Sequence, residues 1–188
     1  LLDFVTGKRR WAHGPIVALV LLGLHDLGDF ANELPGLGAL FFGLAGLIVA
    51  SPANPSGTML DRDGLAALVT RAQEIGAAFI SDEIYHGIQY DGRRPVTALE
   101  VTDDVYVINS FSKYFSMTGW RVGWMVVPES HVRTVERLAQ NMFICPSTAG
   151  QRLALYAMDS PEELDANVAV YAENRRLMIE GLPKAGFK

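Results

Sequence analysis

The stretch "INSFSKYFSMTGWRVGW" spans residues 108–124 and places two cations, Lys113 and Arg121, among serines, aromatic residues and glycines. Apolar runs at residues 105–109 and 122–127 flank its polar centre and predict two strands, so Lys113 follows shortly after a strand end. A lysine that aromatic neighbours shield from water is a nucleophile toward carbonyl compounds and forms Schiff bases with them. A surface lysine on a turn is the alternative interpretation, and the residues around Lys113 must decide between the two.

The rest of the chain predicts the sheet to which these two strands belong. Short apolar runs alternate with segments that carry apolar residues at helical spacing. The predicted strands cover residues 46–51, 77–81, 105–109 and 122–127, and the predicted helices cover residues 61–76, 129–141, 148–158 and 161–182. This alternation is typical of an α/β architecture with a mainly parallel sheet and flanking helices. Residues 1–45 show no convincing period, and we assign no fold to them.

Polar residues follow the predicted strands, where a parallel sheet places ligand sites. Asn54 follows the first strand, Asp82 and Tyr85 the second, and Ser110 and Lys113 the third. A carboxylate at the end of a buried strand is costly unless it is paired, and a protonated ring nitrogen would pair it. The phenol and the side-chain amide could donate to a ligand oxygen. The ordinary alternatives are a helix cap for Asp82, a core aromatic for Tyr85 and a turn residue for Asn54.

A phosphate site is predicted beside the same lysine. The guanidinium of Arg121 suits a phosphate, and Ser110 and Ser112 offer hydroxyl donors. Each of these signals is weak alone, since an arginine beside a strand is usually a packing residue. Together with a Schiff-base lysine, a carboxylate, a phenol and an amide, they are the groups that pyridoxal 5'-phosphate needs.

Three motifs carry a family resemblance. "NPSGT" (residues 54–58), "SDEIY" (residues 81–85) and "NSFSKYFSMTGWRVGW" (residues 109–124) closely resemble the class I/II pyridoxal-phosphate-dependent aminotransferases of fold type I. The resemblance covers about residues 46–188. It implies the central part of a fold type I large domain, incomplete, and an enzyme that transfers an amino group between an amino acid and a 2-keto acid.

The resemblance also implies a role for each matching residue. Lys113 would hold the cofactor as an internal aldimine and would then act as general base and acid. Asp82 would keep the pyridine nitrogen protonated, and Tyr85 and Asn54 would bond the cofactor's 3-oxygen. The implied catalytic set is therefore Lys113, Asp82 and Tyr85.

Further ligands and partners follow from the same resemblance. Ser110 and Arg121 match phosphate ligands, with Ser112 as a weaker candidate. Amino acid and 2-keto acid substrates and a homodimer are implied as well. No metal site is expected.

The chain departs from the family at both ends. Residues 1–45 form a divergent segment without the family's glycine-containing phosphate loop or stacking aromatic. Residues 46–160 match the cofactor-binding core, and residues 161–188 predict a long helix that leads toward a C-terminal small domain outside the chain. The alternatives are therefore a truncated or degenerate, inactive fragment, or another fold type I enzyme such as a lyase or an acyl-transferring synthase.

Composition argues against several other functions. The 188 residues carry a formal net charge of −5 and no long basic run, which argues against a nucleic-acid surface. The apolar runs at residues 15–24 and 34–50 are shorter than the roughly 20 residues that a membrane helix needs, so no membrane role is expected. The single cysteine, Cys145, fits a cytoplasmic protein, and its apolar neighbours predict a buried thiol.

Overall fold

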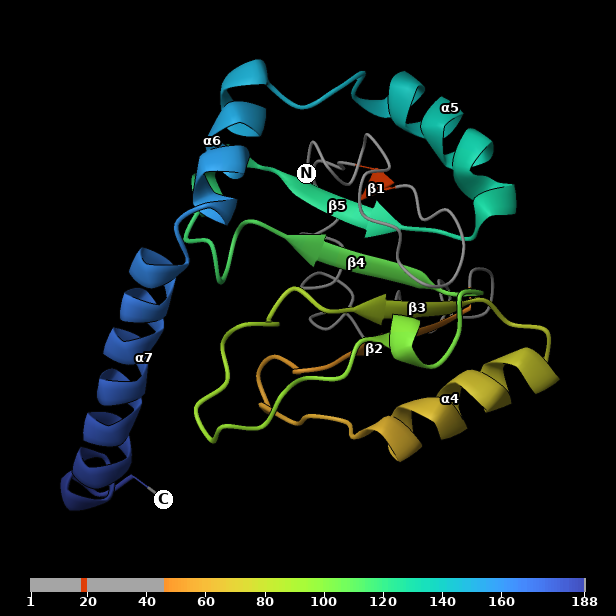
Figure 1. Cartoon of the computed structure of the whole chain (residues 1–188). Coiled ribbons are helices and arrows are strands. Elements are labelled where there is room, and N and C mark those ends of the chain that lie inside the picture. The colour runs from red at the N-terminus through yellow and green to blue at the C-terminus, as the bar shows by residue number, and fades with distance from the viewer. Residues whose placement is uncertain (1–17, 20–45, 188) are drawn as a thin grey trace.

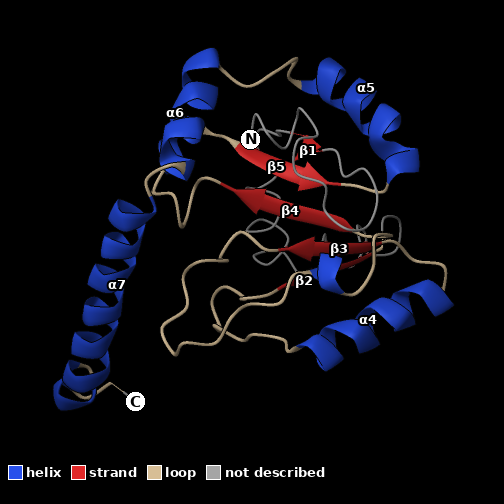
Figure 2. Ribbon diagram, viewed as in Figure 1, coloured by secondary structure: helices blue, strands red, loops and turns tan. Residues whose placement is uncertain are grey.

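The computed structural model describes residues 18–19 and 46–187 of the chain (Figure 1). Its strands are β1 (Ala18–Leu19), β2 (Leu47–Ala50), β3 (Phe79–Asp82), β4 (Tyr106–Ser110) and β5 (Gly123–Val126). Its α-helices are α4 (Arg62–Glu74), α5 (Val132–Met142), α6 (Thr148–Met158) and α7 (Pro161–Gly181). Short 3-10 helices are η1 (Ala98–Glu100), η2 (Thr118–Trp120), η3 (Glu129–His131) and η4 (Pro183–Ala185). Figure 2 shows the α-helices around the sheet, with α7 standing apart from it.

The strands form one sheet with the order β1-β5-β4-β3-β2. The neighbours β2, β3 and β4 are parallel, whereas β5 pairs antiparallel with both β4 and β1. Because two successive antiparallel pairings restore the direction, β1 runs the same way as β2, β3 and β4. In the described sheet β5 alone runs against the others, so the prediction of an α/β fold with a mainly parallel sheet is confirmed.

The predicted elements from residue 46 onward are found within a few residues of their expected bounds. One predicted helix, residues 129–141, is divided into η3 and α5. The start of α4 is fixed by Asp61, whose carboxylate accepts a hydrogen bond from the N–H of Gly64 at 2.8 Å. This bond satisfies one of the N–H groups that the first turn of a helix leaves without a partner.

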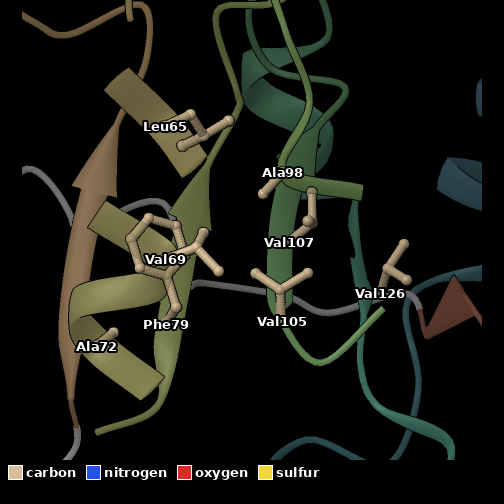
Figure 3. Packing of buried hydrophobic residues seen from close by; sticks show 8 residues of the cluster. All are labelled: Leu65, Val69, Ala72, Phe79, Ala98, Val105, Val107 and Val126. Carbon is tan, nitrogen blue, oxygen red and sulfur yellow. The ribbon is translucent and has the colours of Figure 1, made fainter. Parts of the chain in front are cut away.

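The main core lies between α4 and the sheet (Figure 3). The buried residues of α4 recur at helical spacing and form one apolar face, which packs on the side chains of the neighbouring strands. The cluster consists of Leu65, Val69, Ala72, Phe79, Ala98, Val105, Val107 and Val126.

A second cluster packs α6 against the segment that follows β4. Phe111, Met117, Val122 and Ala154 are buried in it. The rings of Phe111 and Trp124 pack edge to face with their centroids 5.1 Å apart. The loop that carries the candidate lysine is therefore anchored at both ends by buried apolar residues.

The segment around Cys145 differs from its predicted environment. Cys145 is exposed, so the prediction of a buried thiol is wrong. Its neighbour Ile144 is 78% exposed, which shows that this apolar stretch does not pack into the described core. Residues 1–17 and 20–45, which include most of the unassigned segment and most of the apolar runs, lie outside the described residues. Among the helices that are described, none is both long enough and apolar enough to span a bilayer.

Candidate active site

The candidate residues meet at one edge of the sheet. Ala50 and Asp82 are register partners, and Asp82 is also paired with Ile108, so β2, β3 and β4 end side by side. The loops that leave these three strands therefore start from the same edge, and Figure 1 shows the arrowheads of β3 and β4 pointing to the same side. Since β5 is antiparallel to β4, its beginning lies there too, with Gly123 opposite Ser110.

Lys113 lies on a loop that is closed by backbone hydrogen bonds. The N–H of Phe111 donates to the carbonyl of Val122 at 3.0 Å, and the N–H of Met117 donates to the carbonyl of Phe111 at 2.9 Å. These bonds fold the segment back on itself and leave Lys113 half-buried on the turn. The position fits neither a core residue nor a fully solvated lysine.

Lys113 and Tyr85 come together from neighbouring loops. The lysine Nζ lies 5.4 Å from the centroid of the Tyr85 ring, which is a cation–π distance. The two loops also touch at Gly87, where an added Cβ would lie 2.6 Å from ring atoms of Tyr114. Gly87 has a φ of +95°, a conformation that side chains rarely adopt. A glycine is therefore needed here for both reasons.

Asp82 ends β3 as predicted. Its backbone stays in the ladder, while its half-buried carboxylate accepts a hydrogen bond from the N–H of Ile84 at 3.2 Å through Oδ1. The residues that follow form a turn, so the alternative of a helix cap is wrong.

The two predicted serines form a buried pair. Ser110 and Ser112 are 7% and 3% exposed, and their hydroxyl oxygens are 2.9 Å apart. The N–H of Ser112 donates to the Ser110 hydroxyl at 3.0 Å. When Ser110 donates to Ser112, the hydroxyl hydrogen of Ser112 is left to donate elsewhere.

Arg121 lies at the same edge, near the end of the lysine loop and two residues before β5. It follows η2 with a φ of +53°, and its Nη1 donates to the carbonyl of Thr118 at 3.1 Å. Asn54 lies exposed in the loop after β2. The structure thus brings Lys113 to Tyr85 and Ser110 to Ser112, and it places Asn54 and Arg121 on loops at the same sheet edge.

The sequence motifs did not predict a role for Glu83 and His86, which follow β3. Glu83 is buried and follows Asp82 directly. His86 Nδ1 lies 3.5 Å from the Glu83 carboxylate. Burial lowers the pKa of His86 from its ordinary value, although Glu83 and Glu100 act in the opposite direction. The sequence did contain one signal for Glu83, because it is a second charged residue that directly follows Asp82 at the end of a buried strand. The described residues contain no cluster of histidine, cysteine and acidic side chains suited to a metal ion.

Comparisons with known proteins bear on this geometry. The family model for aminotransferases of class I and II matches residues 26–188, which begins earlier than the motifs quoted above. The valine–pyruvate aminotransferase of Mycobacterium tuberculosis is 42% identical over 146 residues, which are 76% of this chain and 38% of that protein. An aspartate aminotransferase of Sulfurisphaera tokodaii is 33% identical over 141 residues, 73% of this chain and 35% of that protein.

Solved structures give the same result. A proposed aminotransferase from Silicibacter pomeroyi is 67% identical, with a TM-score of 0.72, and the match covers 79% of this chain and 40% of that chain. A mutant of the Thermus thermophilus aspartate aminotransferase is 31% identical, with a TM-score of 0.68, over 77% of this chain and 41% of that chain. This chain therefore spans less than half of the length of these relatives.

Proposed function

The chain belongs to the class I and II aminotransferase family, and from that premise we propose that it forms the cofactor-binding core of a pyridoxal 5'-phosphate-dependent aminotransferase. The reaction would transfer an amino group between an amino acid and a 2-keto acid. The observation that carries the proposal is the position of the Lys113 amine over the Tyr85 ring, at the edge where Asp82 ends its strand.

The side chains at this edge fit the chemistry of the cofactor. An aldehyde needs an amine, a pyridine nitrogen needs an acid, and a phosphate monoester needs hydrogen-bond donors and positive charge. Lys113 supplies the amine, Asp82 the acid, and the buried Ser110 and Ser112 with Arg121 supply the donors and the charge. When bound, the cofactor supplies an electron sink for the charge that develops on the substrate α-carbon.

Lys113 has two tasks in the proposed reaction. Its amine would hold the cofactor until the substrate amine takes that place. The released amine then takes the proton from the substrate α-carbon and later returns one, as general base and acid. The cation–π contact with Tyr85 supports this assignment, since it holds the amine at the sheet edge rather than in bulk water.

Asp82 and Tyr85 would set the charge distribution around the ring. A carboxylate paired with the ring nitrogen keeps a proton there, which stabilises the negative charge that reaches the ring in the transition state. The Tyr85 phenol would donate to the cofactor's 3-oxygen, together with the Asn54 amide. Asn54 lies in the exposed loop after β2.

The proposal extends to the partners and the location of the protein. A homodimer and amino acid and 2-keto acid substrates follow from the family. A cytoplasmic location rests on the single cysteine in the sequence.

Titration of the purified chain with pyridoxal 5'-phosphate tests the proposal. We expect a visible absorption band, and after borohydride treatment a covalent label on the peptide that contains Lys113. An amino acid should bleach the band, and a 2-keto acid should restore it. Lys113→Ala should abolish both band and label, whereas Lys184→Ala, which changes an exposed lysine, should leave them unchanged.

The possible outcomes separate the alternatives. A label on Lys113 without bleaching would indicate a cofactor-binding chain that does not transaminate. The absence of both band and label in the wild-type chain would contradict the proposed cofactor site.

A further inference from the structure

A buried carboxylate beside the candidate site has no part in the function proposed above. Glu83 follows Asp82 and is 3% exposed. Its Oε1 accepts hydrogen bonds from the Ser81 hydroxyl at 2.9 Å, the Thr97 hydroxyl at 3.0 Å and the Ala98 N–H at 2.8 Å. A carboxylate is costly to bury unless its oxygens are satisfied, and here one oxygen receives three donors. Glu83 therefore joins the end of β3 to the segment that opens η1.

The other carboxylate oxygen faces a histidine. His86 Nδ1 lies 3.5 Å from Glu83 Oε2, and His86 Nε2 lies 3.0 Å from the carbonyl oxygen of Ser51. A carbonyl can only accept, so Nε2 carries the proton. The groups that face the ring are Glu83, Glu100 and the Ser51 carbonyl, and burial outweighs the two carboxylates in lowering the pKa of His86.

Ser51 connects this pair to the loop that carries Asn54. It is the first residue after β2, and its N–H donates to the carbonyl of Asp82 at 3.1 Å. Its hydroxyl accepts a hydrogen bond from the N–H of Leu60 at 3.0 Å, at the far end of the same loop. One histidine thus contacts a residue that holds both ends of the Asn54 loop.

We propose that Glu83 and His86 are positioning residues that fix Asp82 and Tyr85 for contact with the cofactor ring, an inference that rests on the proposed function. Asp82 ends β3, and the other three residues follow it directly. The side chains of Glu83 and His86 fasten this segment to η1 and to the residue after β2, and Asp82 and Tyr85 are half-buried.

The turn's own bonds are local, such as His86 N–H to the Glu83 carbonyl at 3.0 Å. The sheet holds the start of the segment, since the N–H of Glu83 donates to the carbonyl of Ile108 at 2.8 Å. From Ile84 onward the backbone bonds are local, so the side chains of Glu83 and His86 supply the links from the turn to η1 and to Ser51.

Loss of the Glu83 and His86 contacts would affect the reaction through the positions of Asp82 and Tyr85. A misplacement of a reacting group by about 1 Å can cost on the order of 10²-fold in rate. If the bonds of Glu83 to Thr97 and Ala98 or the bond of His86 to Ser51 are lost, the turn after Glu83 keeps its local bonds but loses that attachment to η1 or to Ser51. The Tyr85 phenol would then shift relative to Lys113, and the Asp82 carboxylate would lose its fixed bond to the N–H of Ile84 while the Asp82 backbone stays in the ladder.

A series of variants in the full chain tests this inference with two measurements. The first is the affinity for pyridoxal 5'-phosphate from its absorption, and the second is amide hydrogen exchange in the cofactor-free protein. His86→Leu and Glu83→Ala should weaken cofactor affinity about tenfold or more and should speed exchange at Ile84 and Ile88, with strand amides of β4 unchanged.

Conservative variants and a control complete the series. His86→Gln keeps a donor for the Ser51 carbonyl, and Glu83→Gln keeps the acceptor for the three donors, so both should restore most of the affinity. Glu136→Ala, which removes a surface carboxylate paired with Arg133, should change nothing at the site.

The results separate this inference from the proposed function. If the wild-type chain binds no cofactor, the proposed function fails, and the positioning role fails with it. If the wild type binds and His86→Leu binds equally well, or if exchange in the turn is unchanged, the positioning role alone is overturned. If Glu83→Ala does not fold, the two His86 variants decide.

Discussion

The Lys113 amine lies over the ring of Tyr85, with Nζ 5.4 Å from the ring centroid. The two residues come from loops that follow neighbouring parallel strands, β4 and β3. Such a contact contributes about 0.5–1 kcal/mol at exposed sites and more when water is excluded. It gives Tyr85 two separable parts, a ring that faces the amine and a phenol that can donate to a ligand.

Tyr85→Phe separates these two parts. The substitution keeps the ring that faces Lys113 and removes only the hydroxyl group. We expect the affinity for pyridoxal 5'-phosphate to fall about threefold to tenfold, which is the value of one hydrogen bond. Equilibrium titration by absorption measures it, and Tyr90→Phe, at a ring that contacts Arg175 instead, serves as the matched control. An unchanged affinity in Tyr85→Phe would assign Tyr85 a packing role only.

Asp82→Asn removes the charge and keeps the shape. The amide oxygen can still accept from the N–H of Ile84, so the turn and the free energy of unfolding should change little. Without the carboxylate, nothing keeps the pyridine nitrogen of the cofactor protonated. The rate of amino transfer should therefore fall by about 10²–10³-fold. Covalent labelling of Lys113 should persist, because attachment does not need the carboxylate.

Single-turnover reaction of the cofactor-loaded protein with an amino acid measures this effect. Asp91→Asn, at an exposed carboxylate paired with Arg93, is the control. Equal rates for Asp82→Asn and the wild type would exclude Asp82 as the partner of the ring nitrogen.

The sequence predicted the architecture well because its signals are local. Apolar runs and helical spacing do not depend on distant residues, and they placed β2 to β5 and α4 to α7 within a few residues. The shared sheet edge then followed from parallel topology alone. The sequence alone therefore groups Lys113, Asp82 and Tyr85 at one site.

Contacts between loops could not be predicted in this way. The burial of Glu83 depends on Thr97 and Ala98, which approach it only after the chain has folded. The exposure of Cys145 depends on a loop that leaves the core, although its neighbours are apolar. Neither fact has a signature in residue spacing, because both depend on tertiary packing.

Gly87→Ala tests the packing of the Tyr85 loop on the Lys113 loop. Gly87 and Gly92 both have positive φ angles, +95° and +73°, so an alanine at either position carries backbone strain of about 1–2 kcal/mol. Only at Gly87 would the added Cβ also meet Tyr114, at 2.6 Å, whereas Gly92 has no atom within 4 Å of such a Cβ. We expect Gly87→Ala to lower the free energy of unfolding by about 1–3 kcal/mol more than Gly92→Ala.

Denaturant unfolding of the two variants measures the difference. Since Tyr114 is next to Lys113, Gly87→Ala should also reduce cofactor affinity, and Gly92→Ala should not. Equal destabilisation in the two variants would mean that the loops separate freely at Gly87.

Tyr114→Phe tests the link between α7 and the lysine loop. The Tyr114 hydroxyl donates to Asp165 Oδ1 at 2.7 Å. Because Asp165 lies on α7 and Tyr114 follows Lys113, this bond joins α7 to the lysine loop. Burial of the phenol, with the hydrogen bond to Asp165 and its charge, raises the pKa of Tyr114 to about 12. Loss of the hydroxyl should lower the free energy of unfolding by about 1 kcal/mol at neutral pH. Tyr156→Phe, at a residue that is 70% exposed, should have almost no effect.

The pH dependence of this link has a definite sign. The phenol is neutral below its pKa, and the folded state holds its proton more tightly than the unfolded chain, where the pKa is 10.0. The stabilisation by Tyr114 is therefore fully present below pH 10 and is lost as the pH rises toward 12. The difference in unfolding free energy between the wild type and Tyr114→Phe should thus shrink over this window. A difference that stays constant or grows from pH 9 to pH 11.5 would show that the hydroxyl does not donate to Asp165, because an ionised phenol has no proton to give.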